Sequence, residues 1–176
     1  MKSAGKTIAV IGGGSAGFTA ARIACKLGAN VLFFMGDNAD HASLCINAGC
    51  MPSKALFEPI DAMHHAKRHG WLLVEPKHPD EYLAEIVRWK DNEIGHFRAY
   101  RQKEIRELAS STFTIIRSNA CFVSDHDVVS EGKRHAFDAA IIATGSVSVF
   151  PQIAGIDPAW GGAWPSAGVL QIHAIP

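Results

Sequence analysis

The sequence predicts an α/β fold with a central parallel sheet, one long helix and a small antiparallel β-meander. Three observations in the 176 residues predict it. A β-branched run over 7–11 leads through glycines into a helical pattern, a second apolar run follows at 31–35, and an amphipathic pattern extends from 80 to about 109. Strand and helix that alternate in this way are typical of parallel sheets.

The composition is that of an ordinary globular chain, with 48% hydrophobic and 19% charged residues and a formal net charge of zero. A chain of this length buries one sizeable core. The charge balance does not favour nucleic acid, and no run of about eighteen apolar residues favours a membrane span. The start of the chain lacks the apolar region and cleavage site of a signal peptide, so we expect a cytoplasmic protein.

The first strand, Thr7 to Ile11, ends in a turn of the form G-x-G-x-x-G, formed by Gly12, Gly13, Gly14, Ser15, Ala16 and Gly17. A helical pattern follows over 18–27. Between a strand and a helix this motif predicts a dinucleotide site: Gly12 permits a tight turn, Gly14 admits a pyrophosphate, and Gly17 allows close packing. The phosphate then lies at the positive end of the helix. A glycine-rich turn without a ligand is the alternative.

The second strand, Val31 to Met35, is predicted to be parallel and fully buried. A dinucleotide site usually carries an acid at its end, about 20 residues past the glycines, which accepts hydrogen bonds from the ribose. Met35 occupies this position and cannot accept a strong hydrogen bond. Asp37 lies two residues further on and is a candidate substitute.

Cys45 and Cys50 stand five residues apart and are followed by Pro52, Ser53 and Lys54. Because a helical turn rises about 5.4 Å, coiling of this segment brings the two sulfurs close enough to bridge. The pair is a candidate dithiol/disulfide switch, although half of a metal site and two unrelated buried thiols are also compatible with it. A helix start and a nearby lysine lower a thiol's pKa, and Lys54 supplies that charge.

The remaining cysteines, Cys25 and Cys121, are expected to stay reduced in the cytoplasm, where a Cys45–Cys50 disulfide would be catalytic or regulatory. A helix is predicted over 55–66, and we interpret His65 and His69 as part of a solvated face rather than as metal ligands. The long helix carries an apolar stripe suited to core packing or to a partner, formed by Leu83, Val87, Ile94, Phe97, Ile105 and Leu108.

Four short strands are predicted to form the small sheet, over 113–117, 120–123, 128–130 and 134–137, with a turn at 131–133. The next segment, 137–146, predicts a buried strand that ends in Thr144, Gly145 and Ser146. The missing side chain at Gly145 would let the backbone approach a cofactor.

These motifs together resemble those of the class I pyridine nucleotide-disulfide oxidoreductases, flavoenzymes such as dihydrolipoamide dehydrogenase, mercuric reductase and glutathione reductase. The resemblance rests on the glycine turn, the string CINAGCMPSK at 45–54 and the string ATGS at 143–146. It implies a Rossmann-like FAD-binding domain over 1–150, incomplete relative to the family, and a linker over 151–176 toward an absent nicotinamide-binding domain. One departure precedes Cys45, where Ala42, Ser43 and Leu44 replace the usual Gly-Gly-Thr, and with Met35 it predicts weaker FAD binding.

The resemblance also implies roles for individual residues. Cys50 would be the flavin-proximal thiol, Cys45 the thiol that attacks substrate, and Lys54 a residue against the flavin ring. The implied FAD contacts are Gly12, Gly14, Ser15, Ala16, Gly17, Met35, Ser43, Lys54, Ala120, Thr144, Gly145 and Ser146, and no metal is implied.

Electrons would pass from NAD(P)H, held by the absent domain, through FAD to the disulfide and then to a small-molecule or protein disulfide or to mercuric ion. Relatives of this kind are homodimers, whereas the oligomeric state of this chain stays open. The isolated chain is expected to be inactive, so a flavin- or nucleotide-binding module without turnover is one alternative. A thiol metal-binding protein is another.

Overall fold

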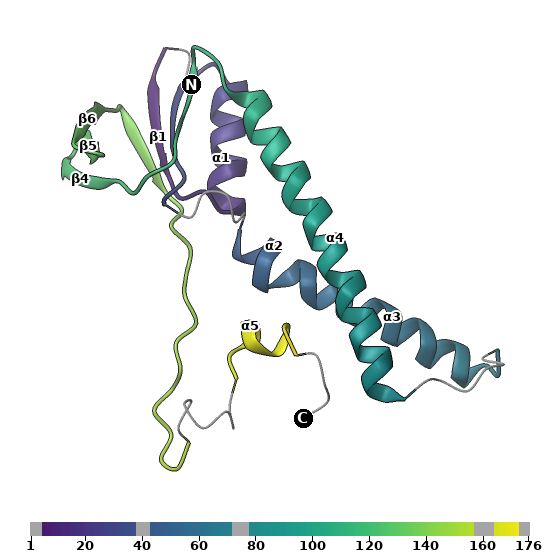
Figure 1. Ribbon diagram of the computed structural model, residues 1–176. Coiled ribbons are helices and arrows are strands. Elements are labelled where there is room, and N and C mark those ends of the chain that lie inside the picture. The colour runs from purple at the N-terminus through teal and green to yellow at the C-terminus, as the bar shows by residue number, and fades with distance from the viewer. Residues whose placement is uncertain (1–4, 38–42, 72–77, 157–163, 173–176) are drawn as a thin grey trace. The chain divides into compact units, whose positions relative to one another are not determined.

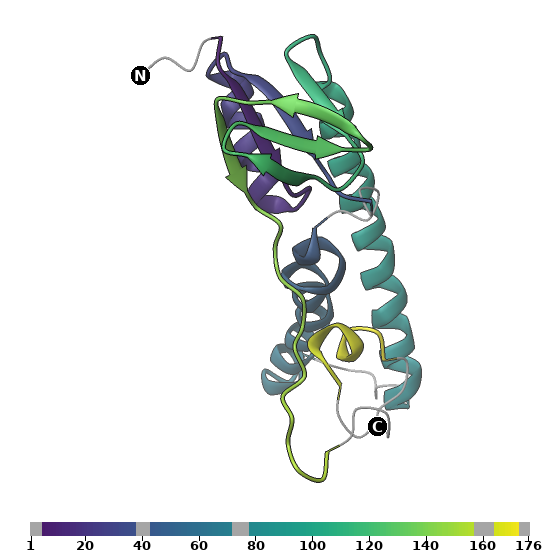
Figure 2. The same ribbon diagram turned by 90° about the vertical axis from the view of Figure 1, so that its left-hand side faces the viewer.

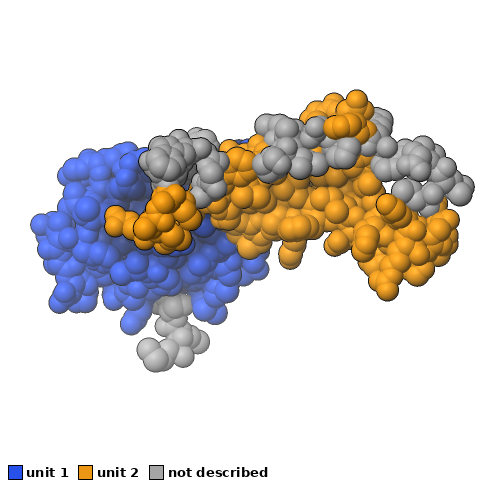
Figure 3. Space-filling model, turned by 90° about the horizontal axis from the view of Figure 1, so that it is seen from below, with its two compact units in different colours: residues 1–44, 98–146 blue, residues 45–97, 147–176 orange. Residues whose placement is uncertain are grey.

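The computed structural model describes residues 5–37, 43–71, 78–156 and 164–172 (Figure 1). The chain divides into two compact units, which Figure 3 distinguishes by colour. Unit 1 contains Met1–Leu44 and Arg98–Ser146, and unit 2 contains Cys45–Phe97 and Val147–Pro176. The two units are defined by packing and not by function. The predicted boundary after residue 150, between an FAD-binding domain and a linker, therefore stays a prediction. Part of the predicted linker, 157–163 and 173–176, lies outside the described residues.

Unit 1 is built on a four-stranded parallel sheet with the order β3-β2-β1-β7. The strands are β1 (Thr7–Ile11), β2 (Asn30–Phe34), β3 (Phe113–Ile116) and β7 (Ala139–Ile142). Helix α1 (Ser15–Lys26) connects β1 to β2 and covers one face of the sheet (Figure 1). The predicted first strand is confirmed, and α1 begins three residues earlier than its apolar pattern does.

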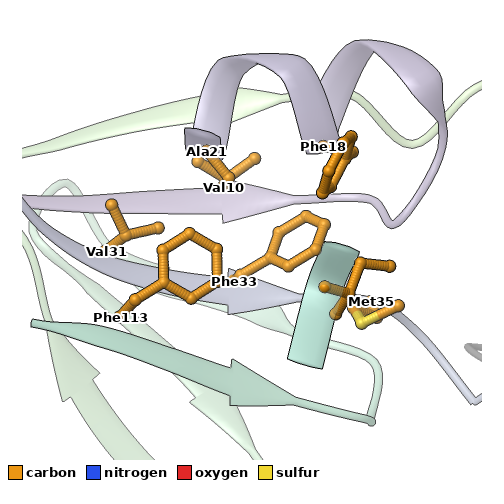
Figure 4. Packing of buried hydrophobic residues seen from close by; sticks show 8 residues of the cluster. Val10, Phe18, Ala21, Val31, Phe33, Met35 and Phe113 are labelled. Carbon is orange, nitrogen blue, oxygen red and sulfur yellow. The ribbon is translucent and has the colours of Figure 1, made fainter. Parts of the chain in front are cut away.

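The core of unit 1 lies on both faces of this sheet. On the α1 face one buried cluster joins side chains of α1, β1, β2 and β3 to Ile105 (Figure 4). Phe33 meets Phe113 edge to face, with ring centroids 5.9 Å apart. Such a pair adds about 0.5–1.5 kcal/mol beyond its buried area. The cluster consists of Val10, Phe18, Ala21, Val31, Phe33, Met35, Ile105 and Phe113.

The opposite face is covered by a three-stranded antiparallel meander of β4 (Cys121–Ser124), β5 (Asp127–Ser130) and β6 (Lys133–Ala136) (Figure 2). Val128 and Phe137 pack there against β1 and β2. The β5–β6 turn has positive φ at Glu131 and Gly132, the backbone that matches the twist of a hairpin. The predicted meander is thereby confirmed.

Two strand predictions need correction. The run that begins at Phe113 was predicted for the small sheet, but β3 pairs with β2 and extends the parallel sheet. A run of four strand-forming residues does not indicate which strand it pairs with. Here the contact between Phe113 and Phe33 determines the pairing of β3 with β2. The predicted buried strand before Thr144 is β7, which lies at the edge of the described sheet and whose Ile142 is 69% exposed.

Unit 2 is helical. It contains most of α2 (Leu44–Ala48), α3 (Cys50–Arg68), the first part of α4 (Pro79–Leu108) and α5 (Ser166–Val169). The predicted long helix is confirmed to within one residue at each end. None of the helices in the described residues is long and apolar enough to cross a membrane.

The buried positions of α4 follow the predicted stripe only in part. Val87, Ile94 and Ile105 are buried, whereas Phe97 is 41% exposed. Lys90 is 4% exposed, and its ammonium group donates a hydrogen bond of 2.6 Å to the carbonyl of Leu170. Lys90 therefore lies on the buried face of α4. A pattern of apolar residues does not predict a lysine at such a position.

Candidate functional site

The three glycines of the turn after β1 have different surroundings. At Gly12, whose φ is +121°, an added Cβ would lie 2.0 Å from the carbonyl oxygen of Ala143. At Gly17 it would lie 1.8 Å from the carbonyl oxygen of Gly12. At Gly14 it would meet, among the described atoms, only the Cβ of Ser43 at 4.0 Å. Gly12 and Gly17 therefore serve the packing of the turn, whereas at Gly14 no described atom lies closer than 4.0 Å to an added Cβ.

The first backbone N–H groups of α1 follow Gly14 directly. The helix runs for 12 residues, Gly14 is its N-cap, no side chain of the described residues caps it, and its first turn contains no acid. The first N–H groups of a helix have no partner within the helix, and they carry the positive end of its dipole. The turn and the helix start together have the chemistry of an anion site.

Ser15 and Ser43 join this turn to the segment that precedes Cys45. The hydroxyl of Ser15 donates to that of Ser43 across 2.9 Å, and Ser43 is 5% exposed. Ser43 occupies the second position of the Ala42, Ser43 and Leu44 departure, in which Ala42 lies outside the described residues. Ser43 therefore lies beside the glycine turn, although the segment to which it belongs differs from the Gly-Gly-Thr that is usual in the family.

The second predicted glycine motif lies at the same turn. The N–H of Ala143 donates to the carbonyl of Ile11 across 2.7 Å. A Cβ on Gly12 would come within 2.9 Å of the nitrogen of Thr144. Thr144, Gly145 and Ser146 are exposed, and Gly145 has a φ of +80°. The structure thus brings together two motifs that lie about 130 residues apart in the chain.

The end of β2 separates Met35 from Asp37. Met35 is 8% exposed and packs in the cluster with Phe18 and Phe33 (Figure 4). Asp37 is exposed and accepts hydrogen bonds from the backbone N–H of Asn119, at 3.3 Å, and from its side-chain amide. The predicted contact residue Ala120 follows Asn119 and packs against the second core cluster.

The sequence did not indicate Asn119. It follows β3, and a polar residue after a parallel strand is a signal for the ligand edge of a sheet. The signal became usable only once β3 was assigned to the parallel sheet and not to the meander.

Cys45 lies in α2, and Cys50 begins α3 directly after its N-cap, Gly49. Cys45 is half-buried and Cys50 exposed, and all four cysteines of the chain are free thiols. A hydrogen bond with Cys50, burial and the charge of Cys50 together raise the pKa of Cys45 above its ordinary value. The predicted proximity of the two thiols is confirmed.

Pro52 and Lys54, which follow this pair in the sequence, lie on α3. Pro52 is buried in the first helical turn, which tolerates proline. Lys54 is exposed. The ring of His69 stacks on Trp71, with centroids 5.0 Å apart. Within the part of the chain that the structure describes, no three or more His, Cys, Asp or Glu side chains are grouped to hold a metal ion.

Comparison with known proteins places these features in one family. The sequence profile described as pyridine nucleotide-disulphide oxidoreductase matches residues 6–176. The chain belongs to this family. The expected family is therefore confirmed.

Individual members of the family resemble the chain over most of its length. It is 28% identical to a mercuric reductase of Bacillus cereus, over 95% of this chain and 26% of that protein. It is 27% identical to a dihydrolipoyl dehydrogenase of Bacillus subtilis, over 97% and 37%. The probable pyridine nucleotide-disulfide oxidoreductase RclA of Escherichia coli is 30% identical, over 95% and 34%.

The fold matches a solved member as well. The structure of the HOCl-induced flavoprotein disulfide reductase RclA from Escherichia coli superposes with a TM-score of 0.68 at 24% identity, over 97% of this chain and 35% of that one. The predicted fold class is confirmed. The chain spans about a quarter to a third of the length of the family members that it matches.

Proposed function

We propose that this chain binds FAD at the glycine turn and carries a redox-active pair, Cys45 and Cys50, within an NAD(P)H-disulfide oxidoreductase. The observation that carries the proposal is the opening beside Gly14, at an uncapped helix start, in a chain that also holds two adjacent thiols. We further propose 1–150 as the FAD-binding part and 151–176 as a linker, in a cytoplasmic protein.

The residues present fit a dinucleotide in most respects. A diphosphate needs backbone donors and room, and the first turn of α1 and Gly14 offer both. Around this turn we propose contacts from Ser15, Ala16, Gly17, Ser43, Ala120, Thr144, Gly145 and Ser146, and from Lys54 toward the flavin ring. Met35 offers no strong acceptor, so we expect weaker binding than is usual in the family.

Bound FAD supplies two-electron transfer between a nicotinamide and a sulfur couple. When the Cys45–Cys50 bond accepts two electrons and two protons, the sulfur–sulfur bond breaks and two thiols form. The raised pKa of Cys45 favours its protonated form, which donates toward Cys50. By family resemblance we assign the attack on substrate to Cys45 and the flavin-proximal place to Cys50.

The substrate class is a further part of the proposal. Relatives are described as mercuric reductase and as dihydrolipoyl dehydrogenase, which suggests mercuric ion or a small-molecule or protein disulfide. Both acceptors react with a thiolate, which Cys45 would supply once its thiol proton has been removed. We expect the complete enzyme to be a homodimer.

A binding module without turnover is the second candidate. On this alternative the chain binds a flavin or nucleotide but does not turn over substrate by itself. NADH or NADPH should therefore reduce FAD bound to this chain very slowly or not at all, and fast reduction would exclude this candidate. A colourless protein that takes up a thiophilic metal would instead support a thiol metal-binding function.

The proposal is tested by titrating the purified chain with FAD and following flavin fluorescence. We expect saturable binding of one FAD per chain. The variant Gly14→Val should keep its fold, because among the described atoms an added Cβ would meet only the Cβ of Ser43, at an ordinary contact distance of 4.0 Å, and should lose FAD binding. Gly95→Ala is the matched control, since a Cβ there meets nothing within 4 Å. A folded wild type that binds no FAD would refute the proposal.

A further inference from the structure

The carboxyl end of β2 lacks the acid that a dinucleotide site usually has there. Met35, at that position, is 8% exposed and belongs to the core cluster between the sheet and α1. A thioether is only a weak acceptor, and this one is enclosed by Phe18 and Phe33. The ribose of a bound dinucleotide must therefore find its hydrogen-bond acceptor elsewhere.

The chain turns sharply after Met35 and presents a carboxylate two residues on. Gly36 has a φ of +81°, which L-residues other than glycine rarely adopt, and its N–H donates to the carbonyl of Ser118 across 3.2 Å. This turn fixes the backbone of β2 to the segment after β3. Asp37 follows it directly and is exposed.

Asp37 is held in one orientation by a residue of that segment. Asn119 donates from its backbone N–H to one carboxylate oxygen across 3.3 Å and from its side-chain amide to the other. The carbonyl of Asn119 in turn accepts a hydrogen bond of 2.7 Å from the hydroxyl of Ser130, which is 3% exposed. The carboxylate is thus anchored through Asn119 to a buried hydroxyl of the meander.

The anchored carboxylate keeps the capacity to bind a ligand. Its two oxygens accept about four hydrogen bonds, and among the described residues Asn119 supplies two. Asp37 follows β2, and β2 pairs in parallel with β1, whose carboxyl end opens into the glycine turn. Both features therefore lie at the same edge of the sheet, where open α/β sheets bind their ligands.

We infer that Asp37, positioned by Asn119, accepts hydrogen bonds from the ribose hydroxyls of the adenosine half of the dinucleotide, in place of an acid at position 35. The inference rests on the proposed FAD binding. It makes Asp37 a binding residue and Asn119 a positioning residue.

The test compares FAD affinities of purified variants by equilibrium fluorescence. Loss of charge-assisted hydrogen bonds should weaken FAD binding by about ten- to a hundredfold in Asp37→Ala, with a smaller loss in Asp37→Asn and Asn119→Ala. Asp125→Ala, an exposed acid in the β4–β5 turn, is the matched control and should bind as the wild type does. An Asp37→Ala variant that binds FAD within twofold of the wild type overturns the inference.

A second arm separates ligand contact from local structure. Asp37→Glu keeps a carboxylate at this position, whereas Asp37→Ala removes it. We expect Asp37→Glu to retain clearly more FAD affinity than Asp37→Ala, and equal losses of affinity in the two variants would speak for a structural role of Asp37 and against ligand contact. Circular dichroism and the urea midpoint without ligand establish that each variant is folded.

The outcomes also distinguish this inference from the function on which it rests. If the folded wild type binds no FAD, the proposed function itself fails. If the wild type binds FAD and neither Asp37 variant weakens the binding, the proposed function stands and only the role of Asp37 is wrong.

Discussion

Gly17 lies so close to Gly12 that a Cβ on Gly17 would stand 1.8 Å from the Gly12 carbonyl oxygen. Real Cβ contacts are never this short, and the opposing atom is backbone that cannot swing away. The third glycine of the motif is therefore required by the fold whether or not a ligand is present. At Gly14 no described atom lies closer than 4.0 Å to an added Cβ, so this glycine is required only if a ligand occupies the space beside it.

Substitution of Gly17 should destabilise the folded chain. Gly17→Ala forces α1 away from the turn, and overpacking of this kind costs about 3 kcal/mol. Urea unfolding measures the loss. Gly95→Ala is the control: it lies in α4 with nothing within 4 Å, so alanine should gain about 0.5–1 kcal/mol there. Equal effects of the two substitutions would contradict the packing role of Gly17.

The pKa of Cys45 predicts the pH dependence of its alkylation. The hydrogen bond with Cys50, the largest cause, raises the pKa of Cys45 in the folded chain. Its thiolate should therefore form at higher pH than in the unfolded chain, and iodoacetamide should label it more slowly below that pH. In Cys50→Ala the profile should move to lower pH. Mass spectrometry of the labelled peptide follows it, and an unmoved profile would count against the contact.

The same shift affects stability at alkaline pH. A thiol whose pKa is higher in the folded state contributes stability below its unfolded-state pKa, and this contribution is lost as the pH rises through the folded-state pKa. The urea midpoint of the reduced chain should therefore fall more steeply above about pH 8.5 in the wild type than in Cys45→Ser. If the urea midpoints of the wild type and of Cys45→Ser fall equally with rising pH, Cys45 is not the cause of the alkaline loss of stability.

His135 should make the chain less stable in mild acid. Burial, and next the charge of Lys133, lower the pKa of His135, whose ring also meets Phe34 edge to face at 5.5 Å. Because the unfolded chain binds the proton more tightly, stability falls as the pH drops below about 6.5, and the loss levels off below the folded-state pKa. His135→Gln should reduce the difference between urea midpoints at pH 7.5 and 5.5. His96, which is exposed, provides the control substitution.

Lys90 should hold the α5 segment in place. Its bond to the Leu170 carbonyl is the kind of charged hydrogen bond that contributes about 1.5–3 kcal/mol, so Lys90→Met should accelerate amide exchange over 166–172. Hydrogen exchange with mass spectrometry measures the effect. Arg88→Met, on the exposed side of α4, should leave this segment unchanged. Unchanged exchange in Lys90→Met would mean that other contacts hold α5.

The sequence was sufficient where a structure depends on local chemistry. Gly17 was predictable because the atom that excludes a side chain there, the carbonyl oxygen of Gly12, lies only five residues away, whereas Gly12 is crowded by Ala143 in a distant segment. The bounds of α4 were predictable because 30 residues of one period leave little ambiguity. The proximity of Cys45 and Cys50 was predictable from their five-residue spacing, but their division between two helices, α2 and α3, with Gly49 between them, was not.

It was insufficient where a contact joins distant segments. A four-residue run does not predict that Phe113 packs on Phe33, so β3 was assigned to the wrong sheet. For the same reason the contact between Asp37 and Asn119 was missed. The burial of Lys90 and the exposure of Phe97 likewise depend on what the rest of the chain places over α4. Tertiary packing determines the exposure of both side chains, and the periodicity of the sequence does not predict it.

The most direct test of the proposed function is the absorption spectrum of the FAD-loaded chain after reduction by a dithiol. If FAD and the cysteine pair form one redox unit, a long-wavelength band from a thiolate against the flavin should appear. It should persist in Cys45→Ser and disappear in Cys50→Ser. A spectrum without this band in the wild type, or a band that survives in Cys50→Ser, would contradict the proposal.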